Sequence, residues 1–447
     1  MLNPFSLIKS EQQSELKELK EIADILNVSF PINNQLGNNL HINEKFLRDI
    51  SEKIRNQWID KCTRNSMYTY KSPDKNIEIY NINNNKIEFG YERCLSPDTI
   101  EKNINSFQNT NWSQKNLIFS SAMSAMTCVL ISLNRIFYKR KIKGSFIGGY
   151  FETYNLVQAF NTSGTEIIPI QHKDLSKYDL NDFDFHIIEP TIYNFSLETV
   201  DIENIVENIQ SGEDKKIKFL VIDSTLLGST FNINRILEQI DKDCSQNIIP
   251  IIVRSLVKTD QFGFEFANAG LLSIYINSST KKYLKHLDVF LGSLRSTMGL
   301  GIELKSLDLL SFSTFTNSFN HAEKLLRNTD VLAKSLRGNR GILGDIIHPI
   351  LHSNLNSQAS PFVFIQLKTK DEKDCIDLLD FLVSEIKKIG FDLRVSNSFG
   401  FRDLNLEYIK TLESQPKYYL KISPGQYKGL IFYHIINLIN SHEEIIG

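Results

Sequence analysis

The chain has 447 residues, of which 41% are hydrophobic and 23% are charged, and its formal net charge is −2. This length predicts two or three domains, since one domain usually takes roughly 100–200 residues. The composition excludes a disordered, collagen-like or disulfide-rich protein, and 50 basic residues nearly balance 52 acidic ones. No global field therefore favours nucleic acid or a membrane as a partner.

Residues 1–88 are polar, rich in asparagine and mostly helical in pattern. Within them, residues 71–90 predict a turn, a short strand, an asparagine-rich turn and a second strand. We expect this region to form an N-terminal helical arm or cap, separate from a catalytic core. Its first residues become charged too early for a signal peptide.

Residues 89–312 predict an α/β domain in which short apolar runs alternate with helical stretches. The expected strands lie at 116–121, 144–150, 165–170, 184–190, 217–225 and 247–255, with helices at 124–141, 153–164, 197–212 and 233–245. Such alternation is typical of a mostly parallel sheet with helices on both faces. The most apolar stretch, residues 117–133, indicates a buried helix, because a membrane span needs about 20 more uniformly apolar residues.

Residues 313–447 predict a smaller α+β domain. The expected helices lie at 315–336, 371–390 and 429–443, and the expected strands at 360–368, 391–398 and 417–425. This mixture of elements differs from the regular alternation before it.

The cysteines are spaced too far apart for a zinc motif. They are Cys62, Cys94, Cys128, Cys244 and Cys375. Reduced thiols in a cytoplasmic protein are the simplest interpretation. The histidines form no HxxxH or HExxH pattern, so we expect no metal site.

Two predicted strands end in residues that carry chemistry. One strand ends in Asp223, Ser224 and Thr225, and the next ends in Ser255 and is followed by Lys258. In an open parallel sheet, ligands bind beyond the carboxyl ends of the strands. Pyridoxal 5′-phosphate (PLP) needs such a pair, because a lysine forms a Schiff base with it and a carboxylate keeps its pyridine nitrogen protonated. The alternatives are a surface lysine and an aspartate that caps a helix.

A phosphate site and an aromatic ring are expected at the same edge. Ser121, Ala122 and Met123 open a helix directly after a strand, where backbone N–H groups favour an anion. Tyr150 ends the next strand and could stack on a pyridine ring or simply belong to the core.

Six motifs in chain order resemble those of the Cys/Met-metabolism PLP-dependent enzymes of fold type I, which include cystathionine γ-synthase, cystathionine β-lyase and methionine γ-lyase. The motifs lie at 91–97, 119–126, 150–154, 187–194, 221–225 and 254–258. The resemblance covers residues 89–430, and six degenerate motifs in register are together fairly specific.

The resemblance implies roles for individual residues. Lys258, Asp223 and Tyr150 would be catalytic. The cofactor ligands would be Ser121, Ala122, Met123, Tyr150, Asn194, Asp223, Thr225, Ser255 and Lys258, with Tyr91 and Arg93 reaching the phosphate of the neighbouring subunit. The last two imply a homodimer or homotetramer. Because the spacing from Glu189 differs by one residue from the family pattern, Tyr193 competes with Asn194.

The sequence departs from the family at several positions. Val257 replaces a threonine, Ser224 replaces an asparagine, and residues 259–270 lack a Gly-His pair. Lys421 stands where the family has the arginine that holds the substrate α-carboxylate, and Arg402 is the alternative. A lysine supplies a point charge and not a bidentate fork.

The resemblance implies a PLP-dependent lyase or transferase that acts on an amino acid, abstracting its α-proton and then eliminating or replacing a β- or γ-substituent. The departures at residues 257 and 421 favour a second hypothesis, a divergent biosynthetic enzyme acting on an unusual amino acid in a specialised pathway. A third, from another class, is a PLP-fold binding partner without catalysis.

Overall fold

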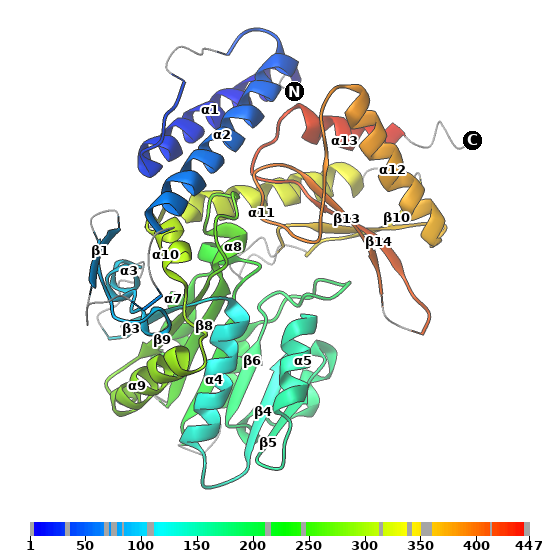
Figure 1. Cartoon of the computed structure of the whole chain (residues 1–447). Helices are drawn as coiled ribbons and strands as arrows, with labels where there is room; N and C mark the ends of the chain where they lie inside the picture. Colours follow the sequence, from blue (N-terminus) through cyan, green and yellow to red (C-terminus); the bar gives the residue numbers. More distant parts are fainter. Residues whose placement is uncertain are drawn as a thin grey trace.

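The computed structural model in Figure 1 contains, in its described residues, an N-terminal helical hairpin, a small two-stranded sheet and two larger sheets. It describes residues 4–31, 36–66, 71–72, 78–82, 85–104, 111–210, 216–242, 247–312, 316–337, 342–349, 360–411 and 414–441. No helix in these ranges is both long and apolar enough to cross a lipid bilayer. Nor do the described side chains include a group of metal-binding residues.

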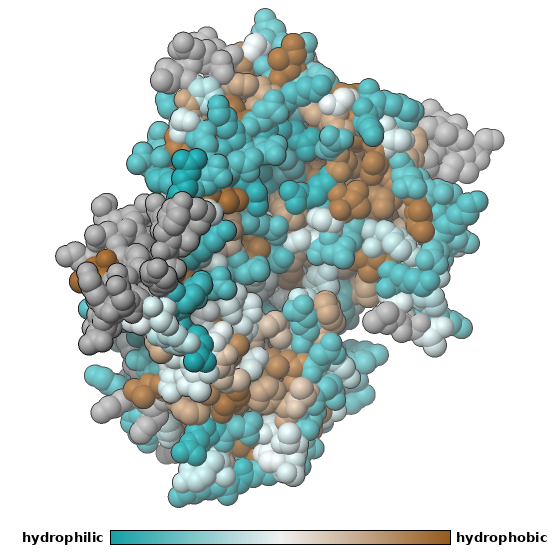
Figure 2. All heavy atoms as spheres, in the orientation of Figure 1, coloured by the Kyte–Doolittle hydropathy of each residue, from teal (hydrophilic) through white to brown (hydrophobic). Residues whose placement is uncertain are grey.

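The N-terminal region begins with two long helices, α1 (Pro4–Leu26) and α2 (Leu40–Ser66). Their apolar sides, which include Leu19 and Trp58, are buried together with α10 (Leu304–Leu310). The Trp58 indole donates a hydrogen bond to the Leu309 carbonyl (3.0 Å). On the face seen in Figure 2, the outer surface of the hairpin is mostly hydrophilic. The expected arm is therefore packed firmly onto the rest of the molecule.

The two strands expected near residue 80 are present. They are β1 (Glu78–Ile82) and β2 (Asn85–Phe89), which pair antiparallel. The turn between them, at 83–84, lies outside the described residues. The proposed domain boundary at 88/89 falls within β2, and the one at 312/313 follows α10.

The larger sheet has seven strands in the order β3-β9-β8-β7-β6-β4-β5. They are β3 (Ser113–Phe119), β4 (Ile142–Ile147), β5 (Thr165–Pro169), β6 (Phe185–Ile188), β7 (Lys218–Asp223), β8 (Ile248–Ser255) and β9 (Gly270–Ile276). Strands β5, β4, β6, β7 and β8 run parallel, and β9 is antiparallel to both of its neighbours. The predicted α/β fold with a mostly parallel sheet is confirmed. Strand β9, which lacks a crossover helix before it, was not among the predicted strands.

Helices cover both faces of this sheet. One face packs against α4 (Ala122–Ile136) and α9 (Lys281–Thr297), beside α5 (Phe151–Phe160), and the other against α6 (Ile202–Gln210) and α7 (Ile233–Lys242). The short helical elements are η1 (Glu92–Cys94), α3 (Asp98–Asn103), η2 (His172–Lys177), η3 (Leu180–Asp182), η4 (Gly228–Thr230) and α8 (Leu256–Thr259). The single buried helix predicted for residues 117–133 is wrong at its start, because residues 117–119 end β3.

The smaller sheet has five strands in the order β10-β11-β14-β13-β12. The elements of this region are α11 (Thr316–Arg337), β10 (Leu343–Ile347), β11 (Val363–Leu367), α12 (Glu372–Lys388), β12 (Arg394–Val395), β13 (Asn405–Lys410), β14 (Tyr418–Ser423) and α13 (Leu430–Ser441). Strands β10 and β13 were not predicted. In the antiparallel β13–β14 pair, Glu407 lies opposite Lys421. The four cysteines in the described ranges are free thiols, and Cys244 lies outside those ranges.

Candidate active site

Asp223 and Lys258 emerge from neighbouring parallel strands. Asp223 is the last residue of β7, and β8 ends at Ser255, directly before the short helix α8 that carries Lys258. The register pairs Asp223 with Val253, so both groups follow the carboxyl edge of the sheet. The two strand ends singled out in the sequence are thus brought side by side.

Asp223 is a half-buried carboxyl group whose hydrogen-bond donors are polar but uncharged. It accepts a hydrogen bond from the Thr225 backbone N–H (3.0 Å), and the Thr225 hydroxyl accepts one from the Ser255 N–H (3.0 Å). Burial raises the pKa of Asp223, although hydrogen bonds from Thr225 oppose the change. In the described part of the chain, no cationic side chain forms an ion pair with it. A buried carboxylate without a counter-ion is costly and would be stabilised by a cationic ligand.

The Lys258 amine is held against the C-terminal region. Its Nζ donates to the Ser398 hydroxyl (2.6 Å), which in turn donates to Glu265 (3.2 Å), and Nζ lies 3.9 Å from the same carboxylate. The side chain is 26% exposed. Burial lowers the pKa of Lys258, while the negative charge of Glu265 opposes that effect. A lowered pKa favours the unprotonated amine that Schiff-base chemistry needs.

Tight backbone packing fixes the loop that carries Ser398. Gly400 has a φ of 89°, and a Cβ at this position would overlap with the Lys258 carbonyl group. The Asn405 side-chain amide donates to the Ser398 carbonyl (2.9 Å). Glu265 adopts a left-handed φ of 47°, which is uncommon for a residue other than glycine. Neither Ser398 nor Glu265 was predicted as a site residue, because neither belongs to one of the six motifs.

The start of α4 offers backbone donors. The Ser121 side chain caps the helix by accepting from the Ser124 N–H (3.0 Å). The N–H groups of Ala122 and Met123 have no hydrogen-bond acceptor within the described structure. Gly270 allows this loop to pack closely, because a Cβ there would overlap with the Ser121 backbone. First-turn N–H groups of this kind suit an anion such as a phosphate.

A buried carboxyl group organises the loop that carries Tyr150. Glu189 accepts hydrogen bonds from the backbone N–H groups of Gly149 (3.0 Å), Tyr150 (3.0 Å) and Tyr193 (2.9 Å). Burial raises the pKa of Glu189 to about 7. Burial also raises the pKa of the Tyr150 phenol, with further contributions from Glu152 and Asp223, so that the ring stays neutral.

Tyr193 reaches this ring and Asn194 turns back on its own loop. The ring centroids of Tyr150 and Tyr193 lie 5.8 Å apart in an edge-on arrangement. The Asn194 side chain accepts hydrogen bonds from the backbone and hydroxyl of Ser196 (3.1 and 3.2 Å). Of the two positions, Tyr193 is the one that contacts Tyr150, and the choice between them as a cofactor ligand stays a prediction.

Tyr91 and Arg93 lie apart from Lys258. Tyr91 precedes η1 and Arg93 lies within it, and the Arg93 guanidinium lies 5.1 Å from the Tyr91 ring centroid. Tyr91 is 39% exposed. No contact in the described ranges joins either residue to Asp223 or Lys258, so a role at a neighbouring subunit's site stays a prediction.

The two candidate carboxylate ligands have different surroundings. Lys421 is buried and forms an ion pair with Glu407 on the neighbouring strand, with its Nζ 6.0 Å from the Tyr193 ring. Burial lowers the pKa of Lys421, and the nearby charge of Lys258 contributes to the shift. Arg402 is also buried, but it pairs with Glu15 of α1 (2.6 Å) and donates to the Phe262 carbonyl (3.1 Å). Lys421 therefore faces the site, whereas Arg402 anchors the N-terminal hairpin.

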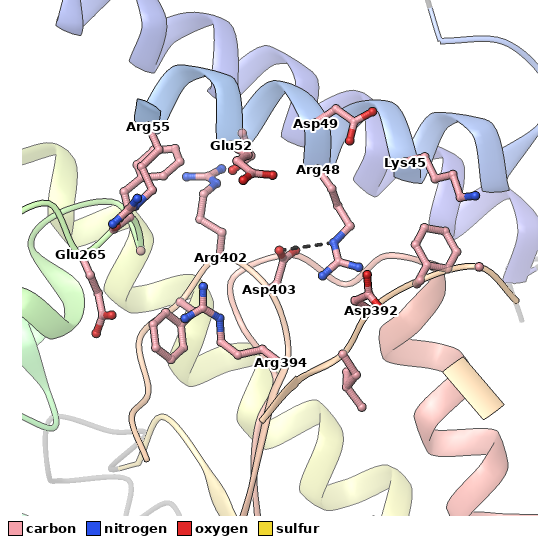
Figure 3. Close-up of a pocket in the computed structure, with 17 residues that line it drawn as sticks. Lys45, Arg48, Asp49, Glu52, Arg55, Glu265, Asp392, Arg394, Arg402 and Asp403 are labelled. Carbon is pink, nitrogen blue, oxygen red and sulfur yellow. Dashed lines mark hydrogen bonds and ion pairs between the residues drawn. The ribbon is translucent and has the colours of Figure 1, made fainter. Parts of the chain in front are cut away.

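A charged cavity of about 670 Å³ lies beside the site, between α2 and the C-terminal region (Figure 3). Its walls carry both signs of charge: Lys45, Arg48, Arg55, Arg394 and Arg402 face Asp49, Glu52, Glu265, Asp392 and Asp403. Within it, Arg48 pairs with Asp403 (3.4 Å). Glu265 belongs to this wall and also contacts the Lys258 network, so the cavity adjoins the candidate site.

Comparison with known proteins gives a match in structure alone. No family model and no curated protein matches the sequence. A cystathionine γ-synthase from Xanthomonas oryzae pv. oryzae superposes with a TM-score of 0.58 at 12% identity, covering 84% of this chain and 92% of that one. The fold is that of fold type I PLP-dependent enzymes. Yeast cystathionine γ-lyase gives 0.56 at 16% identity, covering 85% and 98% of the two chains.

A methionine γ-lyase from Micromonospora echinospora is a third similar structure. Its TM-score is 0.54 at 15% identity, covering 73% of this chain and 80% of that one. These neighbours bear the names of the family whose motifs the sequence resembles. The resemblance in motif order is thus matched by a resemblance in fold.

Proposed function

We propose that this chain is a PLP-dependent lyase or transferase that binds its cofactor through Lys258 and acts on a small amino-acid substrate. The observation that carries the proposal is Asp223, a half-buried carboxyl without a cationic partner in the described structure, on the strand next to the one that leads to Lys258. The protonated ring nitrogen of PLP would supply the missing positive charge.

The surrounding residues fit the rest of the cofactor. The N–H groups of Ala122 and Met123, with the Ser255 hydroxyl, would hold the phosphate, and Thr225 orients the Asp223 carboxylate. Tyr150 would stack on the ring, and Tyr193 would support it. Val257 adds no hydroxyl at the position where the family has one.

Each residue then has a task in the reaction. PLP, when bound, supplies an electron sink for negative charge that develops at the substrate α-carbon. Lys258 accepts the α-proton at Nζ, and its burial favours the neutral amine required for that step. Ser398 and Glu265 hold this amine in place from the C-terminal side. Asp223 would hold the ring nitrogen through a charge-assisted hydrogen bond.

The choice between the two enzyme hypotheses concerns the substrate. Elimination or replacement on a sulfur-containing or activated amino acid follows the names of the structural neighbours. A divergent biosynthetic reaction on an unusual amino acid is favoured by Val257 and by the pairing of Lys421 with Glu407. The domain division at 88/89 and 312/313, the homodimer or homotetramer and the cytoplasmic location remain part of the proposal.

Cofactor absorbance tests this proposal. The purified protein, incubated with PLP and desalted, should show a band at about 420 nm that moves when a substrate amine is added. Lys258→Ala should abolish the band, whereas Lys410→Ala, at an exposed lysine of β13, should retain it. A band that survives in Lys258→Ala would contradict the assignment. A protein with the band but no turnover would support the non-catalytic alternative.

A further inference from the structure

We infer that the site favours substrates whose group beside the reacting amine is neutral or cationic, such as an amide, an ester or a bare amine, over a free α-carboxylate. The inference rests on the proposed function, since it concerns what binds next to Lys258. It arises from the charges that the structure places around that amine.

The cation that faces the site is already neutralised. Lys421 on β14 and Glu407 on β13 are cross-strand partners and form an ion pair, with side chains 1% and 13% exposed. Aromatic rings enclose the Lys421 ammonium, since its Nζ lies 5.0 Å from the Phe362 ring and 6.0 Å from the Tyr193 ring. A carboxylate could reach Lys421 only by competing with Glu407 in this enclosed space.

That competition is unfavourable for a carboxylate ligand. Displacing Glu407 would leave a second carboxylate in the same enclosed region without its cation, and a buried charge that loses its partner is strongly destabilising. A neutral amide or an ester can bind without displacing Glu407 from Lys421. It can accept a hydrogen bond from Lys421 while the ion pair stays intact.

Arg402, the alternative ligand for a substrate carboxylate, already forms ion pairs with residues of α1. The Arg402 guanidinium is 4% exposed and is bound by Glu15 (2.6 Å), Glu18 (3.4 Å) and the Phe262 carbonyl (3.1 Å). Burial raises the pKa of Glu18, but the charges of Arg402 and Lys324 outweigh it and lower that pKa to about 2. Arg402 therefore has a stable anionic partner in α1 and is not available to a substrate carboxylate.

The remaining charges near the Lys258 amine are negative. Glu265 lies 3.9 Å from Nζ, and Glu152 and Glu407 are close enough to affect its protonation. Around the Lys258 amine, the carboxylates of Glu265, Glu152 and Glu407 thus outnumber the single neighbouring cation in the described residues, Lys421. Such a field repels a further anion and attracts a cation.

Paired probes test the inference on the PLP-loaded protein. L-methionine and L-methionine amide are titrated separately, and the dissociation constant of each is taken from the absorbance change and from calorimetry. Wild type is compared with Glu407→Gln, which frees Lys421, and with the matched control Glu372→Gln, which removes an exposed carboxylate that pairs with Lys410 of the same sheet. Comparing the methionine-to-amide ratio between variants cancels the different basicities of the two amines.

We expect Glu407→Gln to lower the ratio Kd(methionine)/Kd(amide) by about 10-fold or more, because a charge-assisted bond to Lys421 becomes available. The Glu372→Gln control should keep the ratio within about twofold of wild type. The double variant Lys421→Met/Glu407→Leu removes both charges and should not lose methionine selectively, whereas its affinity for the amide should fall modestly because the hydrogen bond from Lys421 is lost. It tests the inference even if Glu407→Gln folds poorly.

Several outcomes would overturn the inference. They are an unchanged ratio in Glu407→Gln, a wild type that binds methionine about 10-fold tighter than the amide, and a double variant that selectively loses methionine. Wild type that carries PLP on Lys258 but binds neither probe would also overturn it, while the proposed function would stand. If wild type shows no Lys258-dependent band, the proposed function itself fails.

Discussion

The two larger sheets each place a charged side chain at the site, but only one of the two charges has an ion-pair partner in the described structure. The larger sheet presents Asp223, a carboxyl with hydroxyl and amide donors but no ion pair in the described structure. The smaller sheet presents Lys421, which is already paired with Glu407. The charge of Asp223 could therefore be balanced by a bound ligand, whereas the charge of Lys421 is already balanced by Glu407.

This difference separates a ligand site from a structural pair. A buried charge without a partner costs stability, so its presence points to a ligand that completes it. A buried pair needs no ligand and resists one that would split it. Removing the charge should therefore raise the unfolding free energy of the cofactor-free protein at Asp223 and lower it at Lys421.

The largest effect is expected at Asp223. Asp223→Asn keeps the shape but removes the unpaired charge, so the cofactor-free protein should gain about 1–3 kcal/mol in unfolding free energy. PLP affinity should fall about 100-fold, because the ring nitrogen loses its counter-ion. Urea unfolding of the cofactor-free protein and equilibrium dialysis with PLP measure the two quantities.

Asp182→Asn, at an exposed carboxylate of η3, is the matched control and should change neither quantity. A loss of stability in Asp223→Asn with unchanged PLP affinity would show that Asp223 is a structural residue, and the contrast between the sheets would disappear.

The next effect is expected at the paired charge. Lys421→Met leaves Glu407 without its cation and should lower the unfolding free energy by about 3 kcal/mol. Lys421→Met/Glu407→Leu should recover most of this loss, because neither charge then remains buried. Urea unfolding of the cofactor-free proteins gives the comparison.

Lys410→Met, on the same sheet, breaks an exposed ion pair with Glu372 of α12 and should have a far smaller effect. If Lys421→Met were as harmless as Lys410→Met, the Lys421–Glu407 pair would not be the enclosed structural unit described above.

Features set by neighbouring residues in the sequence could be predicted, whereas contacts between distant segments could not. Asp223 and Lys258 stand at the ends of apolar strands, so their shared edge followed from strand order in a parallel sheet. Their partners lie elsewhere in the sequence: Ser398 is 140 positions from Lys258, and Glu15 is 387 positions from Arg402. Tertiary packing alone brings such residues together, and one sequence contains no signal for it.

Strands β9, β10 and β13 were missed for a related reason. The alternation that revealed the parallel strands depends on a crossover helix between them, and β9 returns antiparallel without one. Because β13 was missed, its cross-strand partnership with Lys421 could not be foreseen, and Arg402 and Lys421 were treated as equal candidates.

The smallest effect is expected at Glu265, where the two regions meet through Ser398. Glu265→Gln removes a charge that favours protonated Lys258, so the free amine should become more abundant near neutral pH. The rate at which cofactor-free protein captures PLP at pH 7 should rise about 2–10-fold, and the pH profile of this rate should move to lower pH. Stopped-flow absorbance measures the rate.

Glu265→Asp retains the charge and should stay close to wild type. A slower or unchanged capture rate in Glu265→Gln, with the same pH profile, would mean that Glu265 does not act on the Lys258 amine.

The central claim is most directly tested by locating the cofactor on the chain. PLP-loaded protein is reduced with borohydride, digested, and the modified peptide is identified by mass spectrometry. We predict a single reduced pyridoxyl-phosphate adduct on Lys258. An adduct on Lys421 or another lysine, or no adduct at all, would contradict the account.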